Sequence, residues 1–197
     1  MDPIERVIAL FTESAQLSAN AADSQAAPIT KAAQTIVDCL LGGGKVLACG
    51  NGSSAADAQC FAAQMQHRFE RERPGLPALA LSSDAVVLTA IAFDEGFNEV
   101  FAKQLSALGQ PGDLLFALTT DGMAINICRA VHAAREREMQ VIALTGRDGG
   151  EVAAGLEDAD TEIRAPATEV PRILENHRLV IHCICDLVDL LLMGGEV

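Results

Sequence analysis

KVLACGNGSS, residues 45–54, is a short apolar run that ends in a turn of glycine, asparagine and serine. An alanine-rich helical pattern follows over residues 55–69. A strand, a glycine turn and a helix in this order are typical of α/β folds, and the glycines let the backbone approach a bound group closely. The serines add hydroxyl groups beside the backbone N–H groups at the start of the helix, where anions bind. The stretch therefore predicts an α/β fold with a phosphate-binding loop.

The alternation of strands and helices continues on both sides of this stretch. Further apolar runs predict strands over residues 76–81, 114–118, 141–144 and 161–164. Helical spacing of apolar residues predicts two helices within residues 4–42, then helices over 85–108 (broken near 94–97), 123–137 and 170–193. Together these elements predict a five-stranded parallel sheet covered by helices on both faces.

Size and composition limit the classes of protein to which the chain can belong. With 197 residues, 50% of them hydrophobic, it predicts one domain with a sizeable core. The net charge of −13 repels nucleic acid, so no direct contact with DNA or RNA is expected. No uncharged apolar run approaches the roughly 18 residues of a membrane helix, and the acidic first residues, MDPIER, do not resemble a secretory signal. A cytoplasmic protein without membrane contact is expected.

A second polar loop follows the predicted strand at 114–118. Thr119 and Thr120 stand there before a helix, as the serines do after the first strand. Loops at the carboxyl ends of neighbouring parallel strands converge where open α/β sheets bind ligands, so the two loops predict one site. The alternative is that these hydroxyl residues only cap helices.

Two other kinds of site find little support in the residue spacing. Gly50 and Gly52 resemble part of a dinucleotide-binding fingerprint, but the acidic residue expected about 20 positions later is missing from the end of the next strand. The six cysteines show no zinc-type spacing, so reduced core thiols are expected.

Five segments carry a resemblance to a known family: residues 45–54, 68–80 (RFERERPGLPALA), 112–115 (GDLL), 141–150 (VIALTGRDGG) and the closing helix. Over nearly the whole chain they resemble the phosphoheptose isomerase group of sugar isomerase (SIS) domains. The resemblance implies a flavodoxin-like three-layer sandwich and a homotetramer with active sites at subunit boundaries. It divides the single domain, 1–197, into an N-terminal helical oligomerisation segment (1–44) and an α/β core with the C-terminal helix (45–197). Within the group, the chain resembles most the DnaA initiator-associating (DiaA) proteins, tetrameric binders of the replication initiator.

The resemblance also implies catalytic and metal positions. Isomerases of the group use a Glu and a His as acid and base, and several bind zinc through His, Glu, Gln and His. The corresponding positions here are Cys60, Gln64, Leu174 and His182. Because Gln64 cannot ionise, one of the two catalytic groups is missing. Cys60 and His182 alone do not make a zinc site, so no metal or other cofactor is expected unless the chain is an active isomerase.

Phosphosugar-binding positions are implied in the same way. They are Asn51, Gly52, Ser53, Ser54, Arg68, Asp94, Thr119, Thr120 and Asp121. Asp121 and Ala124 stand where the family has serines, and a carboxylate at position 121 would repel a phosphate. Weak phosphosugar binding is therefore expected unless Asp121 turns away from the loop.

The closing helix ends in four consecutive large apolar residues, 190–193, which one helix face cannot bury. They predict either a subunit interface or an exposed anchor for a protein partner, with Leu192 and Met193 nearest the end of the helix.

Taken together, these features predict a non-catalytic homotetramer that binds DnaA and promotes its assembly at the replication origin, because several joined contacts raise the effective concentration. The alternative is a working sedoheptulose 7-phosphate isomerase for lipopolysaccharide heptose synthesis, with His182 and a second base such as Asp94 or Glu175. A phosphosugar sensor without turnover is a third possibility.

Overall fold

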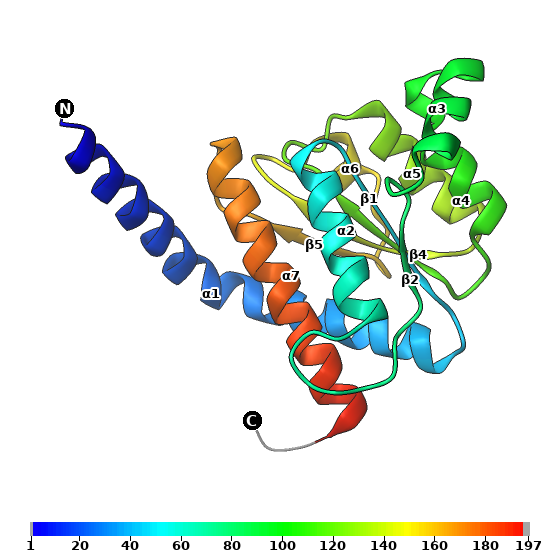
Figure 1. Ribbon diagram of the computed structural model, residues 1–197, viewed down its shortest axis with the longest axis horizontal. Coiled ribbons are helices and arrows are strands. Elements are labelled where there is room, and N and C mark those ends of the chain that lie inside the picture. The colour runs from blue at the N-terminus through cyan, green and yellow to red at the C-terminus, as the bar shows by residue number, and fades with distance from the viewer. Residues whose placement is uncertain (1, 195–197) are drawn as a thin grey trace.

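The computed structural model describes residues 2–194 as three layers built around one parallel sheet (Figure 1). The strands are β1 (Val46–Gly50), β2 (Ala78–Ala80), β3 (Leu114–Leu118), β4 (Gln140–Thr145) and β5 (Thr161–Arg164). Their order in the sheet is β2-β1-β3-β4-β5, with every neighbouring pair parallel. β1 and β3 are buried along their whole length because helices cover both faces of the sheet. The predicted flavodoxin-like α/β sandwich is confirmed.

Seven α-helices and one short 3-10 turn occupy the described residues. They are α1 (Pro3–Leu41), α2 (Ser53–Gln66), α3 (Ala85–Asp94), η1 (Phe97–Glu99), α4 (Ala102–Leu108), α5 (Ile125–Glu136), α6 (Gly150–Ala154) and α7 (Val170–Met193). α1, α2 and α7 pack on one face of the sheet around Phe61 and Phe116. α3, α4 and α5 pack on the other face around Leu105 and Ile127.

The expectation of two N-terminal helices is wrong, because α1 is one helix of 39 residues. Pro28 lies inside it and removes a backbone hydrogen bond, a change that costs roughly 3 kcal/mol in a helix interior. The helix continues through the proline because Gln25 and Ile29, on either side, are buried in the body of the protein.

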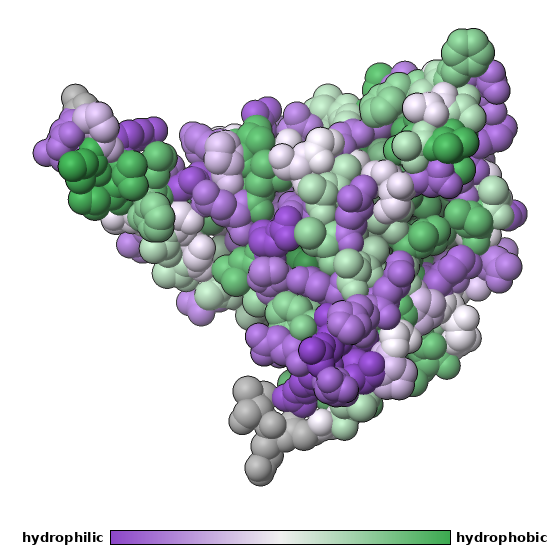
Figure 2. Space-filling model, viewed as in Figure 1, coloured by the Kyte–Doolittle hydropathy of each residue, from purple (hydrophilic) through white to green (hydrophobic). Residues whose placement is uncertain are grey.

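The first half of α1 projects from the body of the protein (Figure 1). Its apolar side chains Ile4, Val7, Ile8 and Phe11 are 69%, 54%, 61% and 76% exposed. Figure 2 shows them as an apolar patch at the tip of the projecting helix. An exposed stripe of this kind marks an interaction surface.

The other elements differ from expectation mainly at their ends. The helical region at 85–108 is divided into α3, η1 and α4 at the expected break, while α6 was not anticipated. The helix expected over 55–69 begins at Ser53 and ends at Gln66, and a loop leads from there to β2.

Two expectations from composition can be compared with the described residues. Within residues 2–194, no helix has both the length and the hydropathy needed to span a bilayer. All six cysteines are free thiols. Cys49 and Cys185 are buried, and burial raises the pKa of each to about 12.

Candidate functional site

A cavity of about 290 Å³ lies at the carboxyl edge of the sheet. It is lined by Asn51, Ser53, Ser54, Leu118, Thr119, Thr120, Asp121, Ala124, Val170 and Leu174. The polar residues come from the loops after β1 and β3, which are neighbours in the sheet, and the first turns of α7 add an apolar wall. We call residues 51–54 and 119–121 the cradle. The prediction that the two loops form one site agrees with this placement.

Close backbone packing shapes the loop after β1. A side chain at Gly50 would overlap the backbone of Ser54, with a Cβ 2.6 Å from its carbonyl carbon. Gly52 has a φ of 56°, a conformation that non-glycine residues rarely adopt, and the chain turns there directly into α2. The loop therefore brings Ser53 and Ser54, the first residues of α2, to the cavity at the positive end of the helix dipole.

The loop after β3 carries the single acidic side chain among the cavity-lining residues. Asp121 Oδ1 accepts a hydrogen bond from the backbone N–H of Met123 at 3.0 Å. Its Oδ2 lies 3.8 Å from the Arg147 guanidinium, and the two side chains are 38% and 48% exposed. Asp121 thus stays in the wall of the cavity, and Arg147 partly balances its charge.

Thr119 stabilises the same loop through a hydrogen bond to its backbone. Its hydroxyl oxygen accepts a hydrogen bond from the Gly122 N–H at 3.1 Å, and its side chain is buried. The Thr119 hydroxyl oxygen therefore faces its own loop from a buried position, whereas Thr120 is partly exposed in the cavity.

Asn126, which sequence reasoning missed, joins the two loops. Its amide group exchanges two hydrogen bonds with the amide of Asn51, at 2.8 and 2.9 Å. Asn126 is the second residue of α5 and is 2% exposed. The sequence contains no spacing signal for this contact, because the two residues lie 75 positions apart.

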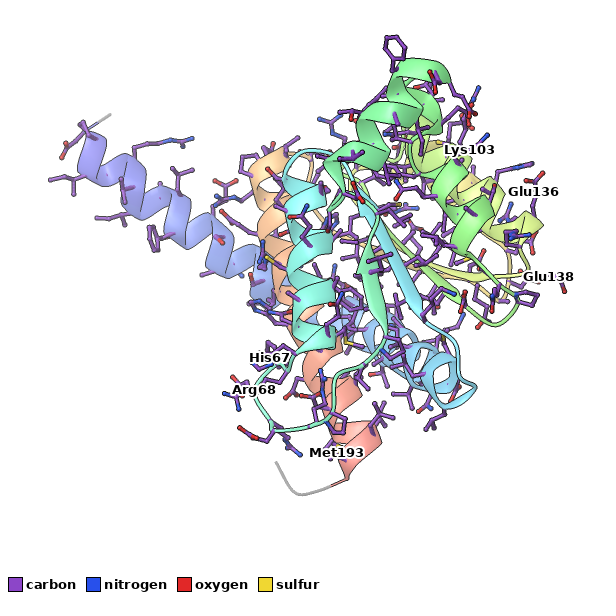
Figure 3. All side chains as sticks on the ribbon, turned by 45° about the vertical axis from the view of Figure 1, so that its right-hand side comes forward. His67, Arg68, Lys103, Glu136, Glu138 and Met193 are labelled. Carbon is purple, nitrogen blue, oxygen red and sulfur yellow. The ribbon has the colours of Figure 1, made fainter. Side chains whose placement is uncertain are left out.

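Three predicted sugar-phosphate residues do not line the cavity of a single chain. Gly52 is exposed at the turn before α2. Arg68 lies beyond the other end of α2 and pairs with Glu72, and Figure 3 shows it next to His67, below the end of α2. Asp94 is the exposed last residue of α3.

The residues implied as catalytic or metal-binding lie along the facing sides of α2 and α7. Gln64 Oε1 accepts a hydrogen bond from the Cys185 thiol at 3.4 Å. The ring of His182 packs against Phe69, with ring centroids 5.6 Å apart. Arg178, on α7, lies beside Cys60 and forms an ion pair with Asp57, so it connects α7 to α2.

A zinc ion does not fit these residues. Leu174 offers no ligand atom, and Cys60 lies beside a cation, the Arg178 guanidinium. Among the described residues, no three side chains of His, Cys, Asp or Glu come close enough together to hold a metal. Zinc binding needs four such ligands, or three and a water.

His177, on α7, is completely buried. Its Nε2 is 2.8 Å from the carbonyl oxygen of Thr145, the last residue of β4. Because a carbonyl oxygen only accepts, Nε2 is the donor of this hydrogen bond. Burial lowers the pKa of the ring, and Nδ1 has no hydrogen-bond partner among the described residues. The ring links α7 to the carboxyl edge of the sheet.

The partner-binding expectation falls on the last turn of α7. Met193 is 52% exposed, whereas Leu192 is partly buried against the core. Leu191, at 43% exposure, is the more accessible leucine.

Comparison with known proteins identifies the fold family. The model of the SIS domain family matches residues 10–146. The phosphoheptose isomerase of Aromatoleum aromaticum is 52% identical over 196 residues, which cover 100% of this chain and 99% of that protein. Solved phosphoheptose isomerases from Neisseria gonorrhoeae and Francisella tularensis superpose with TM-scores of 0.91 and 0.93, at 48% and 43% identity. They cover 95% and 96% of this chain, and 99% of each solved chain is covered in return.

These relatives are all named phosphoheptose isomerase, and none of them indicates the initiator-associating branch. The match extends over the N-terminal helix, the cradle and α7 alike. The chain belongs to the phosphoheptose isomerase family of SIS-domain proteins.

Proposed function

We propose that this protein is a sugar-phosphate isomerase that converts sedoheptulose 7-phosphate, a ketose phosphate, into an aldose phosphate. The observation that carries the proposal is the cavity of about 290 Å³ formed by the cradle loops, which includes the first residues of α2 and the residue that precedes α5. The names of the full-length relatives favour this function over binding of a replication initiator.

The cavity offers the groups that a phosphate monoester needs. Its volume is near the lower end of small-molecule sites, about 300–1,000 Å³, which suits a compact ligand. The hydroxyl groups of Ser53, Ser54 and Thr120 can donate hydrogen bonds to phosphate oxygens. The positive ends of the two helix dipoles favour a dianion at the same place. The negative charge of the Asp121 carboxylate repels such a dianion, and the nearby Arg147 guanidinium weakens this repulsion.

Isomerisation requires proton transfer as well as binding. A proton must leave one carbon and reach its neighbour, while the two oxygens exchange roles as carbonyl and hydroxyl, so a base and an acid are needed. His182 is the titratable group retained at a catalytic position of the family. Of the two candidate bases, Glu175 accepts hydrogen bonds from Ser14 and Arg172 and is held against α1. Asp94 therefore remains as the partner of His182.

Asp94 and His182 lie on elements that cover opposite faces of the sheet, α3 and α7 (Figure 1). One chain cannot bring them to the same substrate. The proposed isomerase therefore includes the homotetramer expected from the family, in which a second copy supplies the missing side chain at the subunit boundary.

A second candidate function is sugar-phosphate binding without turnover. The observation that favours it is Gln64, which the family resemblance puts at the position of the catalytic Glu. Its amide already accepts a hydrogen bond from Cys185 and cannot take up a proton near neutral pH. Such a protein would sense the phosphosugar or present it to a partner.

The experiment is a proton NMR time course of the purified protein with sedoheptulose 7-phosphate, with and without added zinc. Growing signals of the aldose phosphate would support the isomerase. In that case His182→Ala is expected to lower turnover by about 100-fold or more, because one acid/base group contributes at least that much. His132→Ala, on the exposed side of α5, is the matched control and should leave turnover unchanged.

The same sample distinguishes the other functions. Broadened ligand signals without product would favour the non-catalytic binder. Unchanged ligand signals from a folded sample would overturn both proposals, and the initiator-binding expectation would then be tested by mixing the protein with purified DnaA.

A further inference from the structure

Asn51 and Asn126 tie the two cradle loops together through their side chains. Asn51 Nδ2 donates to Asn126 Oδ1 at 2.8 Å, and Asn126 Nδ2 donates back to Asn51 Oδ1 at 2.9 Å. Asn51 lines the cavity, whereas Asn126 stands behind it and is 2% exposed. The ligand can therefore touch the first asparagine and not the second.

We infer that Asn126 is a positioning residue, which fixes the Asn51 amide so that one N–H group faces the bound sugar phosphate; this rests on the proposed function. An asparagine amide has two N–H donors and one oxygen with two lone pairs. The reciprocal pair uses one donor of Asn51 and its oxygen. Its second N–H remains for an oxygen of the ligand, either of the phosphate or of the sugar.

The orientation of Asn51 matters because the two ends of an amide act in opposite ways on an anion. An N–H group attracts a phosphate oxygen, whereas the amide oxygen repels it. Without Asn126, the Asn51 side chain could rotate and present either end, since the terminal torsion of asparagine is broad. The buried pair removes this freedom before the ligand arrives, which lowers the cost of binding.

A second pair of the same chemistry provides a matched control. Gln25 on α1 and Asn176 on α7 also exchange two side-chain hydrogen bonds, at 2.9 and 3.0 Å. Both residues are buried, at 5% and 2% exposure, and neither lines the cradle cavity. Loss of this pair should therefore affect stability alone.

The test compares Asn126→Asp with Asn176→Asp. A carboxylate can accept a hydrogen bond but not return one, so each substitution breaks one of two bonds and leaves an acceptor facing an acceptor. Both variants are expected to have a lower Tm than the wild type. Only Asn126→Asp is expected to weaken the binding of sedoheptulose 7-phosphate, by at least tenfold in Kd measured by titration calorimetry.

A Kd that is unchanged in Asn126→Asp, or changed equally in Asn176→Asp, would overturn the inference. Wild-type protein that does not bind the ligand would refute the proposed function instead, so the two failures can be told apart. Asn126→Ala, which introduces no charge, is the second variant and has the same expected loss of affinity. It separates the loss of the hydrogen-bonded pair from repulsion between a carboxylate at position 126 and the phosphate, and unchanged affinity in Asn126→Ala would also overturn the inference.

A spectroscopic readout tests the orientation directly. In ¹⁵N–¹H spectra of the wild type, addition of sedoheptulose 7-phosphate should shift one of the two side-chain amide protons of Asn51 more than the other. Equal shifts of both protons, or none, would contradict a single N–H group that faces the ligand.

Discussion

Arg73 and Asp189 form an ion pair that is buried on both sides, with 1% and 2% of the side chains exposed. The Arg73 Nε donates to Asp189 Oδ1, and its terminal nitrogens donate to the backbone oxygens of Gln64 and Met65. One guanidinium thus holds the loop after α2, the end of α2 and the last turns of α7 in one place. The same two helices also meet where the Cys185 thiol donates a hydrogen bond to Gln64.

Loss of either partner of this pair is expected to destabilise the fold. Arg73→Met or Asp189→Asn leaves one charged or polar group buried without its partner, which costs roughly 3–5 kcal/mol in comparable buried pairs. Urea unfolding of each variant measures the change. The double variant Arg73→Met/Asp189→Leu should lose less than either single variant, since no charge is left behind. A single variant as stable as the wild type would contradict a stabilising role for the Arg73–Asp189 pair.

Asp121→Ser is expected to strengthen the binding of sedoheptulose 7-phosphate. It removes a negative charge from the cavity wall and adds a hydroxyl donor. Because Asp121 is 38% exposed and lies near Arg147, solvent and the guanidinium screen its charge, so a gain of about tenfold in affinity, or about 1.4 kcal/mol, is expected.

The control for this prediction is Asp148→Ser, which removes the same charge from an exposed position that does not line the cavity. Calorimetric titration of both variants measures the difference. Equal affinity in wild type and Asp121→Ser would mean that the carboxylate does not face the bound phosphate.

His177 is expected to make the stability of the fold depend on pH. Burial lowers the pKa of the ring in the folded protein, while in the unfolded chain the ring has its ordinary value of about 6.5. As the pH falls through that value, the unfolded chain takes up a proton that the folded protein does not, so the free energy of unfolding decreases. The contribution is fully present above about pH 7 and is lost toward acid.

Urea unfolding at pH 7.5 and pH 5.5 measures this dependence. His177→Gln keeps a donor near Thr145 but cannot titrate, so its stability should fall less between the two pH values than that of the wild type. The same fall in both proteins would assign the pH dependence to other groups.

The family resemblance implies a homotetramer, and Phe11→Glu is expected to dissociate it into dimers or monomers. Phe11 is 76% exposed on the projecting half of α1, and a charge within the apolar stripe of Ile4, Val7, Ile8 and Phe11 would oppose burial against another copy. Thr12→Glu adds the same charge on an exposed neighbour outside the stripe and is the control. Light scattering during size-exclusion chromatography measures the mass. A wild type that is already monomeric would refute the expectation.

The sheet and the longest helices could be predicted because their sequence signals are local. The apolar run at 114–118 and the helical pattern at 170–193 correspond residue for residue to β3 and α7. Where local signals conflict, tertiary packing decides. The spacing of apolar residues predicts two helices within residues 4–42, but burial of Gln25 and Ile29 keeps one helix continuous through Pro28.

The site was predictable only in part, for the same reason. Hydroxyl residues that directly follow predicted strands can be recognised in the sequence. The four found in this way, Ser53, Ser54, Thr119 and Thr120, all line the cavity. Asn126 could not be found in this way, since its role arises from a partner that only the folded chain brings near. Asp94 and Arg68 came from the family resemblance, and a single chain does not bring them to the cavity.

The distribution of buried residues along α1 also determines which of its amide hydrogens should exchange with solvent. All of its buried residues lie from Ala21 onward, and no side chain of residues 3–20 is buried. Amide hydrogens in the second half of the helix should therefore exchange with solvent only when the core unfolds, whereas those in the first half should exchange through local fraying. If a neighbouring copy covers part of the first half of α1, protection from amide exchange should begin before Ala21. The first protected residue would then show how far that copy extends along the helix.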